Sequence, residues 1–485
     1  MQTAVRARGG LRLEAHKERS TRDPITTAAP PAHAVLTLDQ HAGERAVPIV
    51  AVGERVALGQ PIARPSTLVS AWLHAPIAGE VVAIEPRPAA NHGGAPALSI
   101  VIANDGSDAR YRERAIEDFT ALAPAELRQW IGRAGIVGLG GAGFPTVAKL
   151  ASAAEREHLA LLINGAECEP YISCDEMLMR ERADEVVLGA RILMHALEAR
   201  ECVIALEDNA PQAQQAMQAA LTRAGDERLR LTQVAAIYPA GGERQLIAAV
   251  FGKEVPHDGL PRDIGVLCHN VATAAAVARW VARGEPLVSR IVTITGAGVA
   301  HARNLDVRIG TPIAQLIEEC GGYTPRITRL LMGGTMMGAA LATDEAAVIK
   351  TTNCIVAASA RDLEPRQPEM PCIRCGNCAE VCPAFLLPQQ LHLNAQALDL
   401  AGLERYGLMD CIECGCCDYV CPSQIPLVER FRQAKPHLAA HLRARAAAQA
   451  ARQRYESRIA RLQRLEAEQR QRLEEKRRLA RRKDS

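Results

Sequence analysis

The chain has 485 residues, 48% hydrophobic and 23% charged, which is too long for one ordinary domain and excludes a disordered or fibrous protein. The net charge of +2 hides an asymmetry, because residues 443–485 hold 15 Lys and Arg against 6 Asp and Glu, and the rest of the chain is mildly acidic. This argues against a nucleic-acid-binding core, and without a signal peptide or a run of roughly 18 apolar residues we expect a protein that is neither secreted nor membrane-spanning.

Residues 1–115 are predicted to form a β-rich domain. Apolar runs broken by Gly and Pro, such as GERVALGQPIA and APIAGEV, indicate short strands and resemble a barrel-sandwich hybrid of the lipoyl or biotinyl type. A carrier domain of that type would need a lysine for its prosthetic group, but no Lys occurs between Lys17 and Lys149. We therefore expect a structural domain.

Residues 125–285 are predicted to form an open α/β sheet, because strand-length apolar runs alternate with helix-like segments. A Gly-rich segment runs from Gly135 to Pro145; it begins within a short predicted strand, AGIVG, and precedes a helix-like stretch. Such a turn can cradle phosphate on backbone N–H groups, although a packing loop fits the glycines equally well. A further strand, LALLIN, runs into Glu167 and Glu169, where α/β ligand sites form.

Residues 288–345 are predicted to form a β-grasp unit, because two strands joined by a Gly-rich turn precede a helix. The segment shows no evident catalytic group, so we expect it to act as a spacer.

Nine of the 15 cysteines lie within residues 365–432, and eight of them fill the ligand positions of two tight clusters, with Cys416 as a spare. One cluster spans Cys372 to Pro383 and the other Cys411 to Pro422, and both read C-x2-C-x2-C-x3-C-P, the run of two-cluster bacterial ferredoxins. In that run three thiolates hold one [4Fe–4S] cluster and the fourth ligates the other. Cluster one is thereby assigned Cys372, Cys375, Cys378 and Cys421, and cluster two is assigned Cys382, Cys411, Cys414 and Cys417.

The gap between Cys382 and Cys411 reads as helical, which predicts an α-helical two-[4Fe–4S] ferredoxin-like module. Each fourth cysteine, Cys382 and Cys421, is expected to begin a helix, and Gly376 and Gly415 permit tight turns. Zinc also binds CxxC pairs, but it would not explain eight ligands in two identical runs.

Residues 437–485 are predicted to form one long basic helix, since they are rich in Ala, Arg, Glu and Leu and contain no Gly or Pro after Pro436. The leucines form only a sparse stripe. A solvated extension and a docking element for anionic lipid or an acidic partner both stay open.

Four segments of the α/β region, GLGGAGFP, NGAECEP, YPAGGERQLI and HNVAT, resemble motifs of the flavin-bearing subunit of respiratory complex I. The resemblance implies FMN contacts by Gly138, Gly140, Gly141, Gly143, Lys149, Asn164, Glu243, Asn270 and Thr273. It also implies NADH contacts by Glu167 and Glu169, with Phe144 near the nicotinamide site. The sequence departs from those motifs at Gly242, which replaces a Glu, at Cys174, which replaces a Lys, and at Tyr171, which replaces a Gly.

The order of the parts resembles the RnfC/RsxC family of ion-translocating electron transport complexes over nearly residues 5–435. The chain shares a GG-x5-HK start and two clusters near the C-terminal side. The resemblance implies a multidomain α/β protein, peripheral on the cytoplasmic side of the inner membrane, that acts as an NADH-linked oxidoreductase and translocase component. Electrons would pass between NADH, FMN and two [4Fe–4S] clusters and onward to integral membrane subunits, a further iron–sulfur subunit or ferredoxin.

Two alternatives stay open. One is a soluble cobalamin-reductase-like flavoprotein, which shares the flavin and double-cluster motifs. The other is a non-catalytic electron-relay scaffold without flavin, which the departures at Gly242 and Cys174 would permit.

Overall fold

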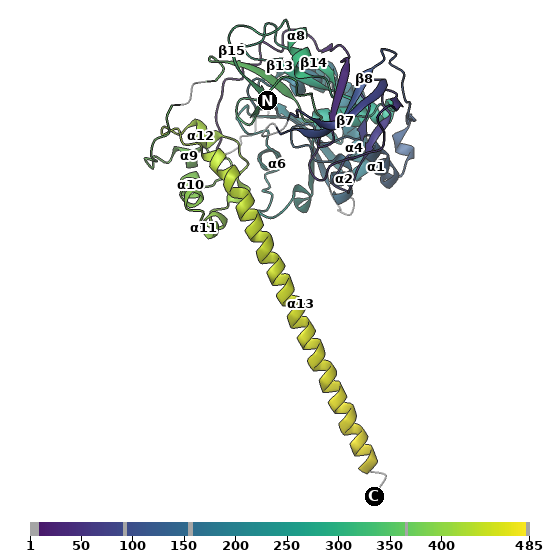
Figure 1. Ribbon diagram of the computed structural model, residues 1–485, viewed down its shortest axis with the longest axis vertical. Helices are drawn as coiled ribbons and strands as arrows, with labels where there is room; N and C mark the ends of the chain where they lie inside the picture. Colours follow the sequence, from purple (N-terminus) through teal and green to yellow (C-terminus); the bar gives the residue numbers. More distant parts are fainter. Residues whose placement is uncertain (1–8, 91–94, 154–158, 364–366, 482–485) are drawn as a thin grey trace. The chain divides into compact units, whose positions relative to one another are not determined.

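The computed structural model describes residues 9–90, 95–153, 159–363 and 367–481 (Figure 1). The chain forms two compact units. Unit one contains Met1–Pro368, Val381–Pro383 and Cys414–Cys416, and unit two contains Glu369–Glu380, Ala384–Glu413 and Cys417–Ser485. Residues 482–485, the end of the predicted basic helix, lie outside the described residues, as do residues 1–8 of the predicted N-terminal domain.

The N-terminal part of unit one is β-rich, as predicted. One antiparallel sheet has the order β2-β8-β7-β4 and a smaller one the order β3-β5-β6. Their bounds are β2 (His33–Thr37), β3 (Val47–Pro48), β4 (Arg55–Val56), β5 (Pro61–Arg64), β6 (Leu73–His74), β7 (Gly79–Arg87) and β8 (Ala97–Asn104). Strand β7 begins with alternating buried and exposed residues, as expected for a strand with one face on the core.

The second part of unit one is an open α/β sheet of four parallel strands in the order β11-β10-β9-β12. The strands are β9 (Ala160–Gly165), β10 (Glu201–Glu207), β11 (Leu229–Val234) and β12 (Val266–Asn270). The helices around them are η1 (Phe119–Ala121), α1 (Pro124–Arg133), α2 (Thr146–Ala153), α3 (Cys174–Glu181), α4 (Ala183–Leu197), α5 (Pro211–Ala224), α6 (Glu243–Phe251), η2 (Pro261–Ile264) and α7 (Val271–Arg283). Strands β9 and β10 are buried almost throughout, as parallel strands covered on both faces are.

The strand predicted at residues 134–138 is wrong. The Gly-rich segment joins α1 to α2 as a loop, and Val137 forms an isolated bridge with Pro145. Gly135 and Gly143 have φ angles of +67° and +63°, which break an extended run. The loop therefore closes on itself and lies outside the parallel sheet.

The third part of unit one contains the predicted pair of strands and helix of a β-grasp unit. They are β13 (Ser289–Thr295), β14 (Arg303–Arg308), which pairs antiparallel with β13, and α8 (Ile313–Glu319). The sheet has the order β1-β14-β13-β17-β15-β16. Its other strands are β1 (Thr26–Thr27), β15 (Ile327–Met332), β16 (Ala339–Ala340) and β17 (Cys354–Ser359). The fully buried β17 was not predicted, and it pairs with both β13 and β15.

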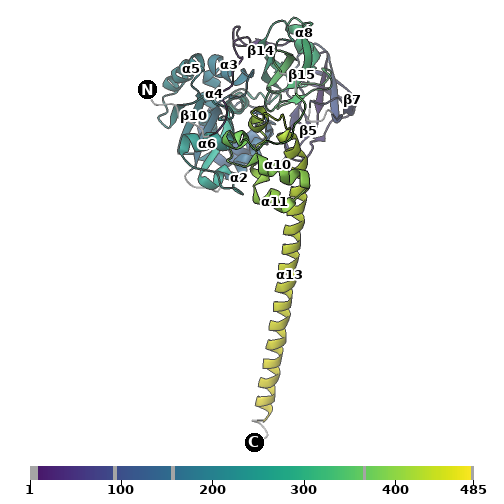
Figure 2. The same cartoon turned by 90° about the vertical axis from the view of Figure 1, so that its left-hand side faces the viewer.

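Unit two is helical around its cysteines, and the predicted helical gap is confirmed. Its elements are α9 (Asn377–Glu380), α10 (Pro388–Ala397), α11 (Leu400–Arg405), η3 (Leu408–Asp410), α12 (Cys416–Tyr419), whose first residue belongs to unit one, and α13 (Leu427–Arg481). Helices α10 and α11 lie beside the first part of α13 in both views (Figures 1 and 2). Leu391, Leu403, Phe431 and Leu438 form the centre of this core.

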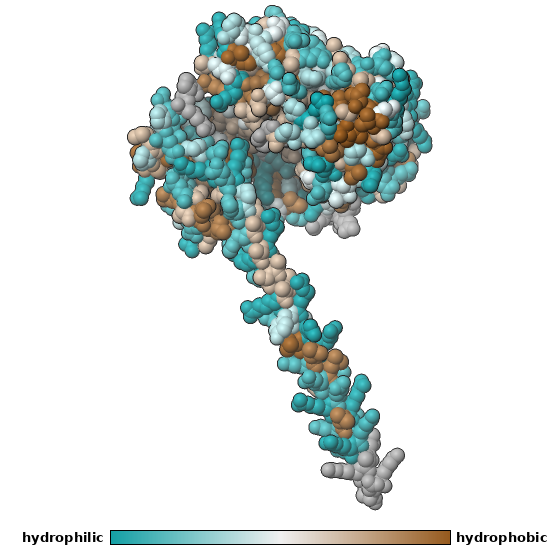
Figure 3. All heavy atoms as spheres, in the orientation of Figure 1, coloured by the Kyte–Doolittle hydropathy of each residue, from teal (hydrophilic) through white to brown (hydrophobic). Residues whose placement is uncertain are grey.

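The long helix begins at Leu427, ten residues before the predicted start at 437, and it runs through Pro436. A proline inside a helix removes one backbone hydrogen bond. Here Phe431 and Leu438 are buried on either side of it, so tertiary packing stabilises the helix across the proline. From residue 443 to residue 478 the helix is almost entirely exposed and largely hydrophilic, with Leu465 48% and Leu473 58% exposed (Figure 3).

The expectation that each fourth cysteine begins a helix is also wrong. Cys382 and Cys421 follow short helices that end at Glu380 and Tyr419. Each precedes a proline, which disfavours helical backbone at the residue before it. Within the described part of the chain, no helix combines the length and the apolar content needed to cross a membrane.

Candidate functional site

The glycine loop (residues 138–144) in unit one presents bare backbone. Gly138 N–H donates to Phe144 O at 2.8 Å, and Gly143 N–H donates to Gly138 O at 3.1 Å. Gly141 has a φ of +110°, and a Cβ placed there would meet nothing within 4 Å. The loop thus offers an open face that a phosphate or a flat ring can approach closely. Phe144, at its end, is 39% exposed.

The glycine loop is held by the first turn of α7. Thr273 Oγ1 accepts the Leu139 N–H at 3.0 Å, and a Cβ on Gly140 would lie 3.3 Å from Asn270 Nδ2. Asn270 caps α7, since its Oδ1 accepts the Ala272 N–H at 2.8 Å. Asn270 ends β12, so the carboxyl end of the sheet fixes the position of the loop.

Two further contacts join the remaining predicted flavin residues to this region. Asn164 pairs in register with Asn270 across β9 and β12, and its Nδ2 donates to Gly241 O at 2.8 Å. Lys149 Nζ lies 2.6 Å from Glu243 Oε1 in a half-exposed ion pair. The structure therefore brings together the nine residues that the resemblance assigned to FMN, and the open glycine face fits a flavin nucleotide.

Glu167 is buried and hydrogen-bonded to α3. Its Oε1 accepts the Asp175 N–H at 3.0 Å and its Oε2 accepts the Glu176 N–H at 3.2 Å, so the carboxylate caps the positive end of that helix. Asp175 in turn accepts a hydrogen bond of 2.5 Å from Asn270 Nδ2. Burial and the nearby Glu167 charge raise the pKa of Asp175 to about 7. Sequence reasoning did not select Asp175, because only the fold brings it to Asn270.

One group of possible metal ligands lies at this point. Atoms of Glu167, Cys174 and Asp175 lie within 4.8 Å of one another. The Glu167 oxygens already accept backbone N–H groups, and Lys17 Nζ lies 3.7 Å from Oε2. A neighbouring ammonium and occupied lone pairs oppose a cation, and Glu167 instead acts as a helix cap for α3.

Glu169, the second acid assigned to NADH, is bound to the turn between β15 and β16. Its Oε1 accepts the N–H groups of Met336 at 2.6 Å and Met337 at 2.9 Å. Burial raises the pKa of Glu169 to about 7, although these two hydrogen bonds lower it in part. Both predicted NADH acids are therefore engaged in internal hydrogen bonds.

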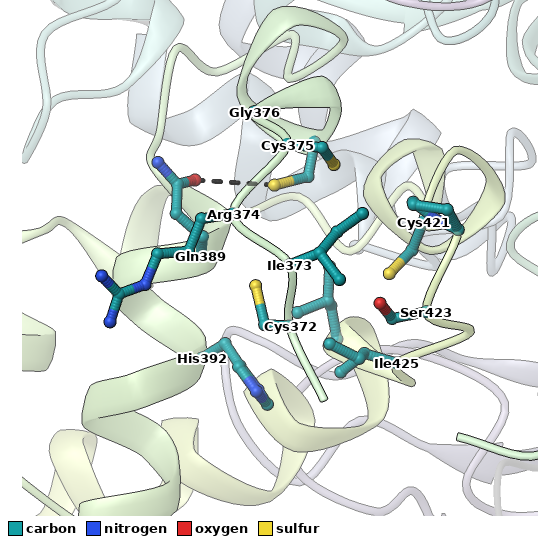
Figure 4. Close-up of a pocket in the computed structure, with 13 residues that line it drawn as sticks. Cys372, Ile373, Arg374, Cys375, Gly376, Gln389, His392, Cys421, Ser423 and Ile425 are labelled. Atoms are coloured by element: carbon teal, nitrogen blue, oxygen red, sulfur yellow. Dashed lines mark hydrogen bonds between the residues drawn. The ribbon is translucent and has the colours of Figure 1, made fainter. Parts of the chain in front are cut away.

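In unit two, four cysteines line one pocket, called here the thiol pocket: Cys372, Cys375, Cys378 and Cys421. Figure 4 shows Cys421 reaching it from a different stretch of chain than Cys372 and Cys375. The crossed assignment of cluster one requires this arrangement. Cys378 Sγ lies 3.5 Å from Gln389 Oε1, the dashed line in Figure 4.

The spacing of these thiols also bears on zinc. Tetrahedral zinc with Zn–S bonds of about 2.3 Å places its sulfur atoms roughly 3.8 Å apart. Over the described ranges, the group Glu167, Cys174 and Asp175 is the one set of three such side chains with all ligand atoms within 4.8 Å. Among the described residues, no three thiols of the pocket meet that limit.

The two cysteine motifs repeat the same backbone 39 residues apart, as the numbers of Cys372 and Cys411 show. Gly376 and Gly415 both have positive φ, as do Arg374 and Glu413 at matching positions. Of the cluster-two set, Cys382, Cys414 and Cys417 are buried and Cys411 is half-buried.

His392 of α10, which sequence reasoning did not select, also lines the thiol pocket. Its Nδ1 lies 3.0 Å from Arg430 Nη1. Burial and then the Arg430 charge lower its pKa, so a neutral imidazole borders the pocket. A lone histidine in a helical gap carries no sequence signal for such a role.

Comparison with protein families divides the chain into four matched regions. Residues 5–107 match the RnfC barrel sandwich hybrid domain, and residues 131–279 match the Nuo51 FMN-binding domain. Residues 291–340 match the SLBB domain, and residues 371–425 match a 4Fe-4S dicluster domain. The glycine loop and the thiol pocket each lie within a matched region.

Curated relatives share one description, the C subunit of an ion-translocating oxidoreductase complex. The protein of Rhodobacter capsulatus is 43% identical over 431 residues, which cover 89% of this chain and 83% of the relative. That of Pseudomonas aeruginosa is 48% identical over 456 residues, 94% of this chain and 58% of the relative. That of Vibrio cholerae is 42% identical over 468 residues, which cover 96% of this chain and 60% of the relative. The chain thus spans about three fifths of the length of the latter two.

A crystal structure of an NAD+-reducing [NiFe]-hydrogenase aligns with a TM-score of 0.47 at 19% identity, over 66% of this chain and 63% of that one. Family membership is carried by the relative of Rhodobacter capsulatus, most of whose length is covered. The chain belongs to the RnfC family, the C subunits of ion-translocating oxidoreductase complexes.

Proposed function

We propose that this chain is the peripheral, NADH-oxidising subunit of a membrane-bound ion-translocating complex. It holds FMN at the glycine loop and passes electrons through two [4Fe–4S] clusters to partner subunits or ferredoxin. The observation that carries the proposal is the glycine loop, which is open at Gly141 and is held by Asn270 and Thr273 at the carboxyl end of a parallel sheet. The descriptions of the relatives favour this function over that of a cobalamin-reductase-like flavoprotein.

FMN, when bound, supplies the conversion between a two-electron donor and one-electron carriers. The chain's own residues bind and orient it. Thr273 and Asn270 fix the loop, Lys149 pairs with Glu243, and Glu167 holds the start of α3 beside Asn270. No residue is needed as a general acid or base, because the protein contributes position and electrostatics.

In the same proposal Cys372, Cys375, Cys378 and Cys421 hold cluster one, and Cys382, Cys411, Cys414 and Cys417 hold cluster two. The four thiols of the pocket and the matched backbone of the two motifs support this assignment. Crossed ligation would keep the clusters close enough for electron exchange. The descriptions of the relatives name a subunit of an ion-translocating complex, which supports partner subunits. The location at the cytoplasmic face of the inner membrane rests on the resemblance to the RnfC/RsxC family.

The test is anaerobic purification with iron, sulfide, zinc and flavin quantified, followed by titration with NADH. We expect about eight irons and one FMN per chain, and loss of the flavin band near roughly 450 nm on adding NADH. Near-stoichiometric zinc with little sulfide contradicts the clusters. Bound FMN that NADH does not reduce contradicts NADH as the donor and leaves the flavin site standing.

A further inference from the structure

The segment that precedes β1, residues 9–21, is called here the N-terminal strap, and it is bound to the α/β domain. Tyr171 N–H donates to Ala15 O at 2.8 Å, and the ring of His16 stacks on that of Tyr171 with centroids 4.7 Å apart. His16 itself has a φ of +52°, a left-handed turn that brings the next residue inward. The residue placed by this turn is Lys17.

Lys17 is buried among three carboxylates. Its Nζ donates to Glu167 O at 2.7 Å and lies 3.7 Å from Glu167 Oε2. It lies 3.8 Å from Glu176 Oε2 and 3.8 Å from Glu207 Oε2. The side chains of Lys17, Glu167 and Glu207 are at most 10% exposed, so this ammonium offsets acids that water does not reach.

The acids outnumber the ammonium. Glu207 Oε1 is buried without a hydrogen-bond partner in the described structure. Burial raises the pKa of Glu207 to about 7, and Lys17 opposes that rise. The charged or titratable groups that face this cluster from neighbouring elements are Glu18, Cys168, Asp175, Arg180, Asp208 and Arg290.

The cluster is continuous with the glycine loop. Glu167 accepts the Asp175 N–H, and Asp175 accepts the Asn270 amide that lies against Gly140. The Cys174 thiol donates to Glu167 Oε1 at 3.3 Å. Position 174 thus presents a thiol to Glu167, and the cation beside Glu167 comes from the strap.

We propose that Lys17 is a positioning residue for the proposed flavin site. Its ammonium keeps the Glu167 cap on α3, and through Asp175 the amide of Asn270, in the arrangement that receives the cofactor. The inference rests on the proposed function, because positioning the Asn270 amide affects binding only where the glycine loop receives a ligand.

The full-length protein tests this with Lys17→Met, Lys17→Arg, Glu207→Gln and the double variant Lys17→Met/Glu207→Gln. An acid with a raised folded pKa favours the fold at low pH and loses that contribution as pH rises through the folded value. Without Lys17, which lowers the pKa of Glu207, that pKa would lie higher, so stability would continue to fall above about pH 7. The Tm of Lys17→Met should therefore lie below that of wild type at both pH values. The deficit should be larger at pH 8.5 than at pH 6 by roughly 5 °C.

Controls separate charge from packing. Lys17→Arg keeps the charge and should follow the wild-type pH profile. The double variant Lys17→Met/Glu207→Gln should recover most of the additional Tm that Lys17→Met loses at pH 8.5. Lys253→Met, which removes an exposed lysine, should leave the profile unchanged.

The second readout is FMN affinity by fluorescence titration. Lys17→Met should bind FMN roughly fivefold more weakly at pH 8. Lys17→Met/Cys174→Lys, which restores a cation next to Glu167, should recover part of that affinity. Equal Tm losses at pH 6 and 8.5, or unchanged FMN affinity, overturn the proposal.

Two outcomes keep the test informative. If Lys17→Met does not fold, Glu207→Gln alone should raise the Tm at pH 8.5 and not at pH 5.5, and a fall at both pH values overturns the proposal. If wild type binds no FMN, the proposed function fails and the positioning proposal with it, whereas a flat Tm profile beside intact FMN binding overturns the positioning proposal alone.

Discussion

The glycine loop of unit one and the thiol pocket of unit two are held by different physical means. The loop is fixed by backbone hydrogen bonds, the Thr273 side chain and buried charges behind it. In the thiol pocket, Cys372 and Cys375 are exposed, and Cys378 is supported by a side-chain contact to Gln389. The comparison teaches that the chain's own contacts position the glycine loop, whereas the exposed thiols Cys372 and Cys375 would gain order from a bound metal.

The largest expected effect breaks the thiol pocket. Cys421→Ser should remove cluster one, because the fourth ligand comes from the other motif, and should leave about half of roughly eight irons. Iron and sulfide analysis of anaerobic protein measures this. Cys320→Ser, which changes a buried cysteine at the C-terminal end of α8, is the matched control and should keep the full iron content. A full iron content in Cys421→Ser contradicts the crossed assignment.

The next effect breaks the glycine loop. Gly141→Ala places a Cβ at a φ of +110°, which costs about 1–3 kcal/mol, and puts a methyl group on the open face. FMN affinity should fall at least about tenfold in a fluorescence titration. Gly225→Ala, at a φ of +60° that ends α5, should lower the Tm without changing FMN affinity. Equal FMN affinity in both variants would show that the loop does not bind the cofactor.

A pH effect sharpens the comparison of the glycine loop with the thiol pocket, because the buried acid Glu169 belongs to unit one, which contains the loop. The pKa of Glu169 is raised from 4.5 to about 7, so its contribution to stability is complete below pH 4.5 and is lost as pH rises through about 7. Glu169→Gln keeps an acceptor for the Met336 N–H and removes the titration. Between pH 5 and 8, the free energy of unfolding of this variant should therefore change less than that of wild type, by about 2–3 kcal/mol. Urea denaturation at both pH values measures this difference. If the free energy of unfolding changes equally with pH in Glu169→Gln and wild type, Glu169 does not have the raised pKa.

The smallest expected effect concerns the exposed part of α13. Removing residues 446–485 deletes side chains that are almost all exposed over the described range, so iron content, FMN affinity and the Tm should stay near wild type. The helical signal in far-ultraviolet circular dichroism should fall in proportion to the number of helical residues removed. A loss of iron on truncation would show that the distal helix supports the pocket. Binding of the intact and truncated proteins to anionic vesicles separates a docking element from a solvated extension.

Much of the fold followed from periodicity. The parallel strands β9 and β10, the β-rich start and the helical gap between the cysteine motifs were all predicted, because their apolar patterns reflect local geometry. The strand at residues 134–138 is wrong, because positive φ at Gly135 and Gly143 overrides an apolar run. Strand β17 was missed, because the β-grasp interpretation ended at residue 345, before this segment begins.

By itself the sequence determined the two cysteine motifs, since thiol spacing along the chain specifies the chemistry of a ligand set. It also located the glycine loop and the acids that follow β9. Only the tertiary structure decided that Glu167 and Glu169 are bound internally and that Lys17 reaches Glu207 from 190 residues away. Such pairings depend on burial and on which strand ends meet at one edge of a sheet, and neither is encoded in local spacing.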